Sequence, residues 1–196
     1  MKTKLVYGIG VMDITGGTRT SPGEVDPAYY RWKMMLRRCY SPEWVERNPT
    51  YEGCVVCDEW LIYSNFRDWF YSQGDVTGKE LDKDIIDPGN MVYSPTTCVF
   101  VDKGLNALLN QRKADRSNTG VIGVSFRTGK YNVFCKVNGS NVYLGRYDDL
   151  QTASKVYRDY KSDYIRSWID RSSDQRIKSG LEKHIQLLED GTYGNS

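Results

Sequence analysis

The stretch that most limits how this chain can fold runs through residues 130–147. From 131 to 137 the side chains alternate in the period-2 pattern of a half-buried strand, with Tyr131, Val133, Cys135 and Val137 set against Asn132, Phe134 and Lys136. Asn138-Gly139 follows, and both residue types tolerate the positive φ of a two-residue hairpin turn. A further run, 141–147, continues after the turn, and a shorter one, 120–127, precedes the first. The sequence therefore predicts a three-stranded antiparallel sheet.

The segment after this sheet has the pattern of a long amphipathic helix. Asp148 is the expected N-cap, and Gln151 stands three residues later at the capping-box position. Apolar residues recur at helical spacing and form one stripe: Ala153, Val156, Tyr157, Tyr160, Tyr164 and Trp168. We expect one face of the sheet to pack on this helix. The opposite face has no cover within this stretch and carries Arg127, Asn132, Phe134, Lys136 and Tyr143.

Positive charge is concentrated on this sheet-and-helix stretch. Residues 121–171 hold nine Lys and Arg against five Asp and Glu, whereas 1–120 hold 15 against 16 and 172–196 hold three against four. A module that binds phosphate groups needs such a local excess. A solubilised surface is the alternative interpretation, because the excess is modest.

A chain of 196 residues fits one large domain or two small ones. No apolar run is long enough to cross a bilayer, and the N-terminus lacks a signal-peptide pattern. We expect a soluble, cytoplasmic protein. Its mixture of short strands and amphipathic helices predicts an α+β fold.

The rest of the chain predicts a small mixed module and a last helix. We expect helices and strands in the order 26–40 (helix), 64–73 (helix), 81–85 (strand), 93–101 (strand) and 102–113 (helix). A last helix over 174–189 has one apolar face, made of Ile177, Leu181, Ile185 and Leu188. That face must dock either on the first domain or on a second copy of the chain, as a homodimer.

The polar run 114–119 is typical of a linker and places a domain boundary there. The predicted organisation is an N-terminal module, a linker, a sheet-and-helix domain, and a docking helix with its tail, over residues 1–113, 114–119, 120–171 and 172–196.

Residues 120–170 resemble the AP2/ERF DNA-binding domain, in the compact form found in phage and mobile-element proteins. The resemblance is carried by Gly123-Val124, Lys130-Tyr131, the step Leu144-Gly145-Arg146-Tyr147, and the helix residues Ala153 and Tyr157. In that family the sheet lies in the DNA major groove, and the side chains that face away from the helix contact bases and phosphates. By position, the resemblance implies contacts with double-stranded DNA from Ser125, Arg127, Lys130, Asn132, Phe134, Lys136, Asn141, Tyr143 and Arg146.

Residues 5–113 resemble a group of phage proteins related to HNH homing endonucleases. The residues that carry this resemblance are those of 32–40, 57–60, Asn65-Phe66, 81–84, 93–98 and Asn106. Such proteins often end in an AP2 unit, so the two resemblances support each other. The implied element is a ββα clamp for one divalent metal, with a His as the general base.

In this chain the HNH-like element is degenerate. Asp82 and Asn106 stand where the Mg²⁺ ligands would be, and Asn90 is a candidate middle residue. Lys83 occupies the position of the catalytic His, and a lysine with its ordinary pKa of about 10.4 is protonated at neutral pH and cannot accept a proton. Charged residues on an exposed strand face are the alternative interpretation of Asp82 and its neighbour Asp84.

The cysteines allow two interpretations. Cys54-x-x-Cys57 is half of a zinc site, which Cys39 and Cys98 would complete as a structural four-thiolate set. Free cysteine is also a common core residue, and Cys135 falls on the core side of the predicted sheet. An odd number of cysteines makes a disulfide framework unlikely.

Together these patterns predict a double-stranded DNA-binding phage protein, resident in the host cytoplasm, with a nuclease module that is no longer active. The first alternative is a metal-dependent HNH-type homing or nicking endonuclease with an altered base. The second is a phage protein that binds and modulates a host protein, and it predicts protein affinity without salt-dependent DNA affinity.

Overall fold

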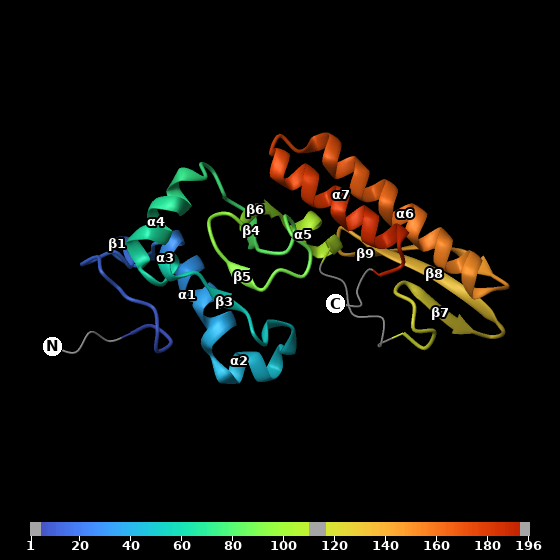
Figure 1. The fold of residues 1–196 in the computed structure, drawn as a ribbon, viewed down its shortest axis with the longest axis horizontal. Coiled ribbons are helices and arrows are strands. Elements are labelled where there is room, and N and C mark those ends of the chain that lie inside the picture. Colours follow the sequence, from blue (N-terminus) through green and yellow to red (C-terminus); the bar gives the residue numbers. More distant parts are fainter. Residues whose placement is uncertain (1–4, 110–116, 193–196) are drawn as a thin grey trace. The chain divides into compact units, whose positions relative to one another are not determined.

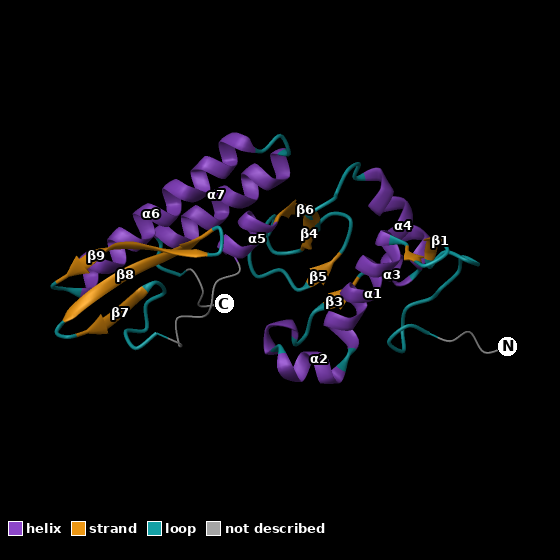
Figure 2. Ribbon diagram, turned by 180° about the vertical axis from the view of Figure 1, so that it is seen from behind, coloured by secondary structure: helices purple, strands orange, loops and turns teal. Residues whose placement is uncertain are grey.

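The computed structural model describes residues 5–109 and 117–192. The chain divides into two compact units: the first comprises Met1–Asp84 and Asn90–Phe100, and the second comprises Ile85–Gly89 and Val101–Ser196. Helices and small sheets alternate along the chain, which confirms the predicted α+β class (Figures 1 and 2).

The first unit contains short helices and three small two-stranded pairings. Its helices are α1 (Pro27–Tyr40), α2 (Pro42–Arg47), a 3-10 turn (Pro49–Tyr51), α3 (Asp58–Leu61) and α4 (Tyr63–Ser72). The pairings join β1 (Arg19–Ser21) to β2 (Glu24–Val25), β3 (Val55–Val56) to β5 (Val92–Tyr93), and β4 (Lys79–Asp82) to β6 (Val99–Asp102), whose last two residues are assigned to the second unit.

An aromatic core holds the first unit together. Trp32, Trp60 and Phe66 are fully buried, and the rings of Trp60 and Phe66 meet edge to face at 5.0 Å. The indole nitrogen of Trp32 donates a hydrogen bond of 2.7 Å to the carbonyl oxygen of Trp60, which ties α1 to α3. The predicted start of α1 is confirmed, since the side chain of buried Asp26 accepts the N–H of Ala28 at 2.7 Å.

The strands of the predicted ββα element are shorter than expected. The predicted strand 93–101 is divided into β5 and β6, because a turn intervenes. The hydroxyl oxygen of Ser94 accepts the N–H of Thr97 at 3.2 Å, and its carbonyl oxygen accepts the N–H of Cys98 at 3.0 Å. The following helix, α5, spans Lys103–Leu109, and the rest of the predicted helix lies outside the described residues.

The second unit contains the predicted three-stranded antiparallel sheet, in the order β7-β8-β9, with the long helix α6 across one face (Figure 1). Its elements are β7 (Val124–Arg127), β8 (Lys130–Val137), β9 (Ser140–Tyr147), α6 (Leu150–Arg171) and α7 (Gln175–Glu189). The core between sheet and helix consists of Val124, Val133, Cys135, Ala153 and Tyr157. This core confirms the predicted inward side of the sheet.

The predicted N-cap of α6 is wrong by one residue. Asp149, not Asp148, caps the helix: its side chain accepts the N–H of Thr152 at 2.7 Å. The capping hydrogen bond holds the pKa of Asp149 below its usual range. Asp148 is released for an ion pair with Lys130.

The apolar face of α7 is buried within the same unit, where α7 lies beside α6 (Figure 2) and against the segment 85–89. Gly180 lies against the backbone of this segment, since an added Cβ would meet the carbonyl oxygen of Ile85 at 2.1 Å. Lys183 donates to the carbonyl oxygen of Ile86 at 3.2 Å and pairs with Asp87 at 3.1 Å. The face predicted to dock is therefore covered inside one chain, so a homodimer would need another surface.

The second unit includes chain upstream of the predicted linker 114–119. Helix α5 packs on β8 and belongs to this unit, as does the segment Ile85–Gly89. Residues 114–116 lie outside the described part of the chain. Asn118 is joined to the edge of β7, because its side chain donates to the carbonyl oxygen of Phe126 at 2.9 Å and accepts the N–H of Phe126 at 3.1 Å.

Within the described ranges, every helix is too short or too polar to cross a membrane.

Candidate nucleic-acid interface

The side of the β7–β9 sheet that faces away from α6 brings together all nine residues predicted to contact DNA. Residues paired across an antiparallel ladder point to the same side of the sheet. The pairs are Ser125 with Asn132, Arg127 with Lys130, Asn132 with Arg146, Phe134 with Tyr143, and Lys136 with Asn141. Because 130, 132, 134 and 136 alternate along β8, these pairs share one side. We call these nine residues the outer face.

Arg146 reaches the outer face only because β9 contains a bulge. Strict alternation from Tyr143 would turn Arg146 toward α6. The register instead passes from Tyr143 to Gly145, so that Leu144 is the extra residue. Gly145 has φ 126°, a conformation that residues with a side chain rarely adopt. The bulge places Arg146 opposite Asn132 and on the outer face.

The Arg146 side chain fastens the turn between β7 and β8. Its Nη2 donates to the carbonyl oxygen and to the hydroxyl oxygen of Thr128, both at 2.9 Å. Thr128 has φ 49° and Gly129 has φ 73°, and a β-branched residue at positive φ is uncommon. The turn carries Arg127 on one side and Lys130 on the other. Arg146 therefore orients two further cations of the outer face.

The four cations of the outer face differ in the ion pairs and hydrogen bonds that they form with other residues. Lys130 forms an ion pair with Asp148, which is 83% exposed. Arg146 is engaged by Thr128. Arg127 and Lys136 are exposed and take part in none of the ion pairs between described residues. These two side chains are the most available for phosphate or guanine contacts.

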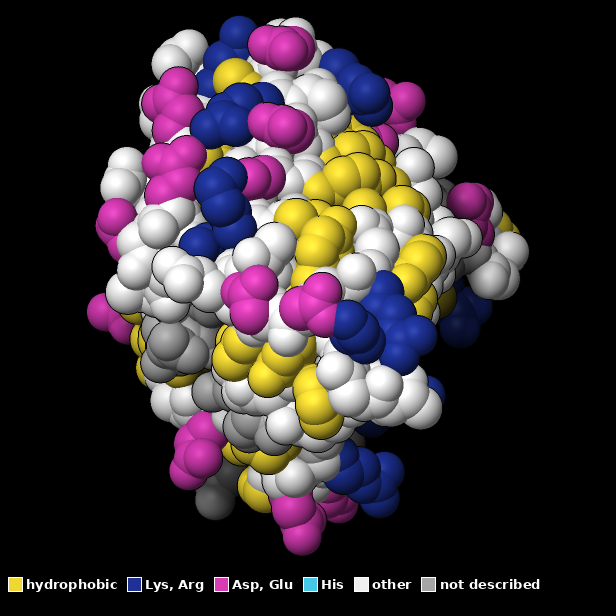
Figure 3. Space-filling model, turned by 90° about the vertical axis from the view of Figure 1, so that its right-hand side faces the viewer, with side chains coloured by type: hydrophobic (Ala, Val, Ile, Leu, Met, Phe, Trp, Pro, Cys, Tyr) yellow, Lys and Arg dark blue, Asp and Glu magenta, His cyan; other side chains and the backbone are white. Residues whose placement is uncertain are grey.

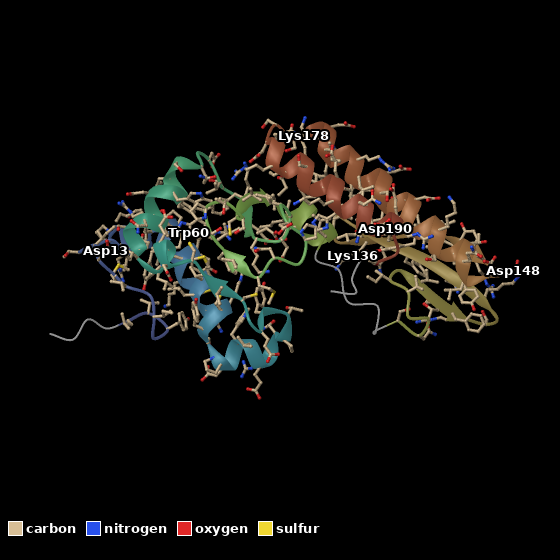
Figure 4. All side chains as sticks on the ribbon, in the orientation of Figure 1. Asp13, Trp60, Lys136, Asp148, Lys178 and Asp190 are labelled. Carbon is tan, nitrogen blue, oxygen red and sulfur yellow. The ribbon has the colours of Figure 1, made fainter. Side chains whose placement is uncertain are left out.

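An aromatic pair occupies the middle of the outer face. Phe134 and Tyr143 lie opposite each other with ring centroids 5.1 Å apart, and 39% and 54% of their surfaces remain exposed. Lys136 lies toward the β8–β9 turn and Asp148 toward the other end of the sheet (Figure 4). Exposed aromatic rings beside basic and amide side chains can contact bases by stacking or by apolar contact with thymine methyl groups.

The outer face contains four cations and no carboxylate. Such a surface matches the negative charge of a phosphate backbone. In the view of Figure 3, hydrophobic side chains form an exposed band, and both basic and acidic side chains lie beside it. Apolar and basic side chains are thus both exposed on that part of the surface.

The residues of the HNH-like element have a different environment. Lys83 is buried and donates to Asp84 Oδ1 at 2.7 Å and to the carbonyl oxygen of Asn90. Burial lowers the pKa of Lys83, but the hydrogen bond and charge of Asp84, with smaller contributions from Cys54 and Asp82, outweigh it, so the net pKa is raised. Lys83 therefore stays protonated at neutral pH.

Asp82 and its neighbours form hydrogen bonds within the fold. Asp82 is buried rather than on an exposed strand face, and its Oδ1 accepts the N–H of Asp84 at 2.7 Å. The Lys83 ammonium donates a hydrogen bond to the neighbouring carboxylate of Asp84. Asp82 belongs to the first unit and Asn106 to the second. Asn90 fastens its own loop, since its side chain donates to the carbonyl oxygens of Lys83 at 2.9 Å and Val92 at 2.7 Å.

The cysteines are free thiols in the structure, and Cys54, Cys98 and Cys135 are buried. Burial raises the pKa of Cys39, helped by the nearby Cys54, to about 12, and burial raises the pKa of Cys98 to about 12. Among the described residues, no group of three or more His, Cys, Asp or Glu side chains has the arrangement of a metal site. The zinc set of Cys39, Cys54, Cys57 and Cys98 is therefore not assembled in this structure.

Three residues that shape the outer face were not predicted from the sequence. Thr128 holds Arg146, Asp148 pairs with Lys130, and Asn118 closes the free edge of β7. A glycine inside a strand pattern, here Gly145, is the signal that indicates a bulge and so the orientation of Arg146. The contacts of Asn118 and Asp148 depend on the path of the loops beside the sheet, and no local sequence pattern predicts that path.

Comparisons with protein-family models, with curated proteins and with solved structures find no match for this chain.

Proposed function

We propose that the protein binds double-stranded DNA, with the outer face of the β7–β9 sheet in the major groove. The observation that carries this proposal is the gathering of nine side chains, all basic, polar or aromatic, on one uncovered face, with four cations and no carboxylate among them. The resemblance of residues 120–170 to AP2/ERF domains supports the same mode of binding. A major groove about 12 Å wide admits strands of this kind.

In this arrangement the outer-face residues have separate tasks. Arg127 and Lys136 contact phosphates or guanine edges, and Asn132 and Asn141 hydrogen-bond to base edges. Phe134 and Tyr143 contact bases through their rings. Arg146 and Lys130 add charge at the end of the sheet where the β7–β8 turn lies.

The test is an equilibrium titration of labelled duplex DNA at several salt concentrations. The wild type should bind with an affinity that falls steeply with salt. Arg127→Gln/Lys136→Gln should reduce the slope of log K against log[salt] by about 1.8, since each phosphate contact contributes about 0.9. The matched control, Lys155→Gln/Lys178→Gln, removes the same charge from α6 and α7 and should leave the slope unchanged. Absence of wild-type binding, or an equal loss in both variants, would contradict the proposal.

We also propose that the N-terminal module does not cleave DNA. The support is the protonated Lys83 at the position of the general base, together with the engaged carboxylates of Asp82 and Asp84. The same titration with added Mg²⁺, read on a denaturing gel, should show no nicking. Mg²⁺-dependent cleavage that is lost in Asp82→Ala would favour the nuclease instead.

A further inference from the structure

Helix α1 of the first unit carries positive charge only. Its 14 residues contain Arg31, Lys33, Arg37 and Arg38 and neither Asp nor Glu. The buried side of α1 consists of Ala28, Trp32, Met35 and Leu36. The opposite side follows the i, i+3, i+4, i+7 spacing of one helix face and consists of Tyr30, Lys33, Met34 and Arg37. We call these four residues the α1 surface.

Two of the four cations of α1 lie outside the α1 surface and form contacts with other elements of the first unit. Arg31 donates to the carbonyl oxygen of Lys79 at 2.6 Å, and the guanidinium of Arg38 lies 5.8 Å from the ring centroid of Tyr51. Lys33 and Arg37 remain on the α1 surface. Neither is a member of an ion pair between described residues.

The side chain of Arg37 is oriented for binding an anion. Its Cζ lies 4.4 Å from the ring centroid of Trp44, so the ring supports the guanidinium. A supported guanidinium keeps its N–H groups in a fixed planar fork, which matches the oxygens of a phosphate. The favourable position of cations near a helix C-terminus accounts for Arg37 but not for Lys33, which lies in the middle of α1.

Exposed Tyr30 completes the α1 surface, with 53% of its surface in solvent. The nearest carboxylate on the N-terminal side, Asp26, pairs with Arg67, and the nearest on the C-terminal side, Glu43 and Glu46 on α2, are exposed without an ion pair to α1. A surface with two half-buried cations, Lys33 and the Trp44-supported Arg37, beside an exposed tyrosine is complementary to a phosphate backbone.

We propose that the α1 surface is a second phosphate-contacting surface, which binds the backbone of double-stranded DNA. The inference rests on the proposed function, because double-stranded DNA is the ligand of both surfaces. Lys33 and Arg37 add two phosphate contacts that carry no sequence information, and the sheet supplies the base contacts.

The test uses the full chain and a duplex of about 40 base pairs, long enough for contacts beyond the sheet. Lys33→Gln/Arg37→Gln should lower the salt slope by about 1.8, so that the ratio of wild-type to variant affinity falls about twelvefold between 50 and 200 mM salt. Lys33→Arg/Arg37→Lys keeps the charge and should keep the slope. Lys155→Gln/Lys178→Gln is the control for loss of charge elsewhere.

The outcomes separate this inference from the proposed function. An unchanged slope in Lys33→Gln/Arg37→Gln, together with a reduced slope in Lys136→Gln, would overturn the α1 inference and leave the sheet as the DNA-binding surface. A reduced salt slope in Lys33→Gln/Arg37→Gln, together with an unchanged slope in Lys136→Gln, would support the α1 inference and contradict the proposed role of the sheet. If circular dichroism shows that the double variant is unfolded, Lys33→Gln alone should still lower the slope by about 0.9, and failure to do so would overturn the inference.

Discussion

Two lysines of this protein each pair with an aspartate, yet their surroundings give them different roles. Lys83 is 5% exposed, and its partner Asp84 is 34% exposed. Lys130 is 40% exposed, and its partner Asp148 is 83% exposed. A lysine–aspartate pair is therefore a contact with a buried ammonium in the first unit and a solvent-exposed contact in the second.

Burial explains the difference. Lys83 satisfies the carboxylate of Asp84 and the carbonyl oxygen of Asn90, both of which would lose a donor if it were removed. An exposed ion pair such as Lys130–Asp148 contributes about 0–1 kcal/mol, because water competes for both charges. Under the proposed function, a DNA phosphate would replace Asp148 at small cost, whereas replacement of Asp84 would disturb the buried ammonium of Lys83.

The largest effect is expected from Lys83→Met. Removal of the buried ammonium takes one donor from the half-buried carboxylate of Asp84 and one from the carbonyl oxygen of Asn90, and should lower the free energy of unfolding by about 2–4 kcal/mol in urea denaturation. Lys155→Met is the matched control, since its pair with Asp159 lies on an exposed helix face and is worth about 0.3–0.5 kcal/mol. Equal losses in the two variants would mean that the Lys83 contact is not a structural one.

Alkaline pH should destabilise the first unit, because the thiols of Cys39 and Cys98 have raised pKa values in the folded chain. The pKa values of Cys39 and Cys98 are raised to about 12 in the folded chain, so their contribution is full below the ordinary thiol pKa of about 9 and is lost as pH rises from 9 toward 12. Each thiol should lower stability by about 1.4 kcal/mol per pH unit in this window. Cys98→Ala should have a shallower decline, measured by urea denaturation at each pH. An identical decline would contradict the burial of this thiol.

Gly145→Ala tests the bulge that orients Arg146. An added Cβ would lie 2.7 Å from Tyr147 Oη at a φ of 126°, so we expect a loss of about 1–3 kcal/mol in thermal unfolding. Duplex affinity should fall as well, because Arg146 and the β7–β8 turn would move. Gly139→Ala, at a φ of 81° in the β8–β9 turn with open space around it, controls for backbone strain alone. It should cost stability with a smaller loss of affinity.

The smallest effect is expected from Asp148→Asn. Removal of this carboxylate frees Lys130 and should raise duplex affinity about two- to threefold at low salt, with little change in stability. Asp163→Asn, which removes an exposed carboxylate paired with Arg166, is the control in titrations of the same duplex. A decrease in affinity for Asp148→Asn would indicate that Asp148 supports the interface rather than competing for it.

The sheet could be predicted because the sequence signals that specify it lie within the strands and turns themselves. Alternation along β8 and the Asn138-Gly139 turn, with φ values of 49° and 81°, determine which side chains face away from α6. The predicted N-cap was wrong by one residue because two aspartates, 148 and 149, are adjacent. The position of Arg146 depends on the bulge, so alternation alone gives the opposite side.

The environment of Lys83 could not be predicted from its strand. Its burial depends on the loop that returns through Asn90, whose carbonyl oxygen accepts the ammonium hydrogen bond. The cysteine set failed to assemble for a similar reason, since spacing in sequence does not determine the approach of Cys39 and Cys98 to the Cys54–Cys57 pair. These features depend on tertiary contacts, which a periodic pattern does not encode.

The most direct test of the central claim is chemical-shift mapping of the full chain by NMR, with duplex DNA added stepwise. The backbone amides of the outer face, above all those of Asn132, Phe134, Lys136 and Tyr143, should shift. The amides on the exposed side of α6, such as Lys155 and Asp159, should remain unchanged. Shifts confined to other surfaces, or the absence of shifts at saturating DNA, would contradict the account.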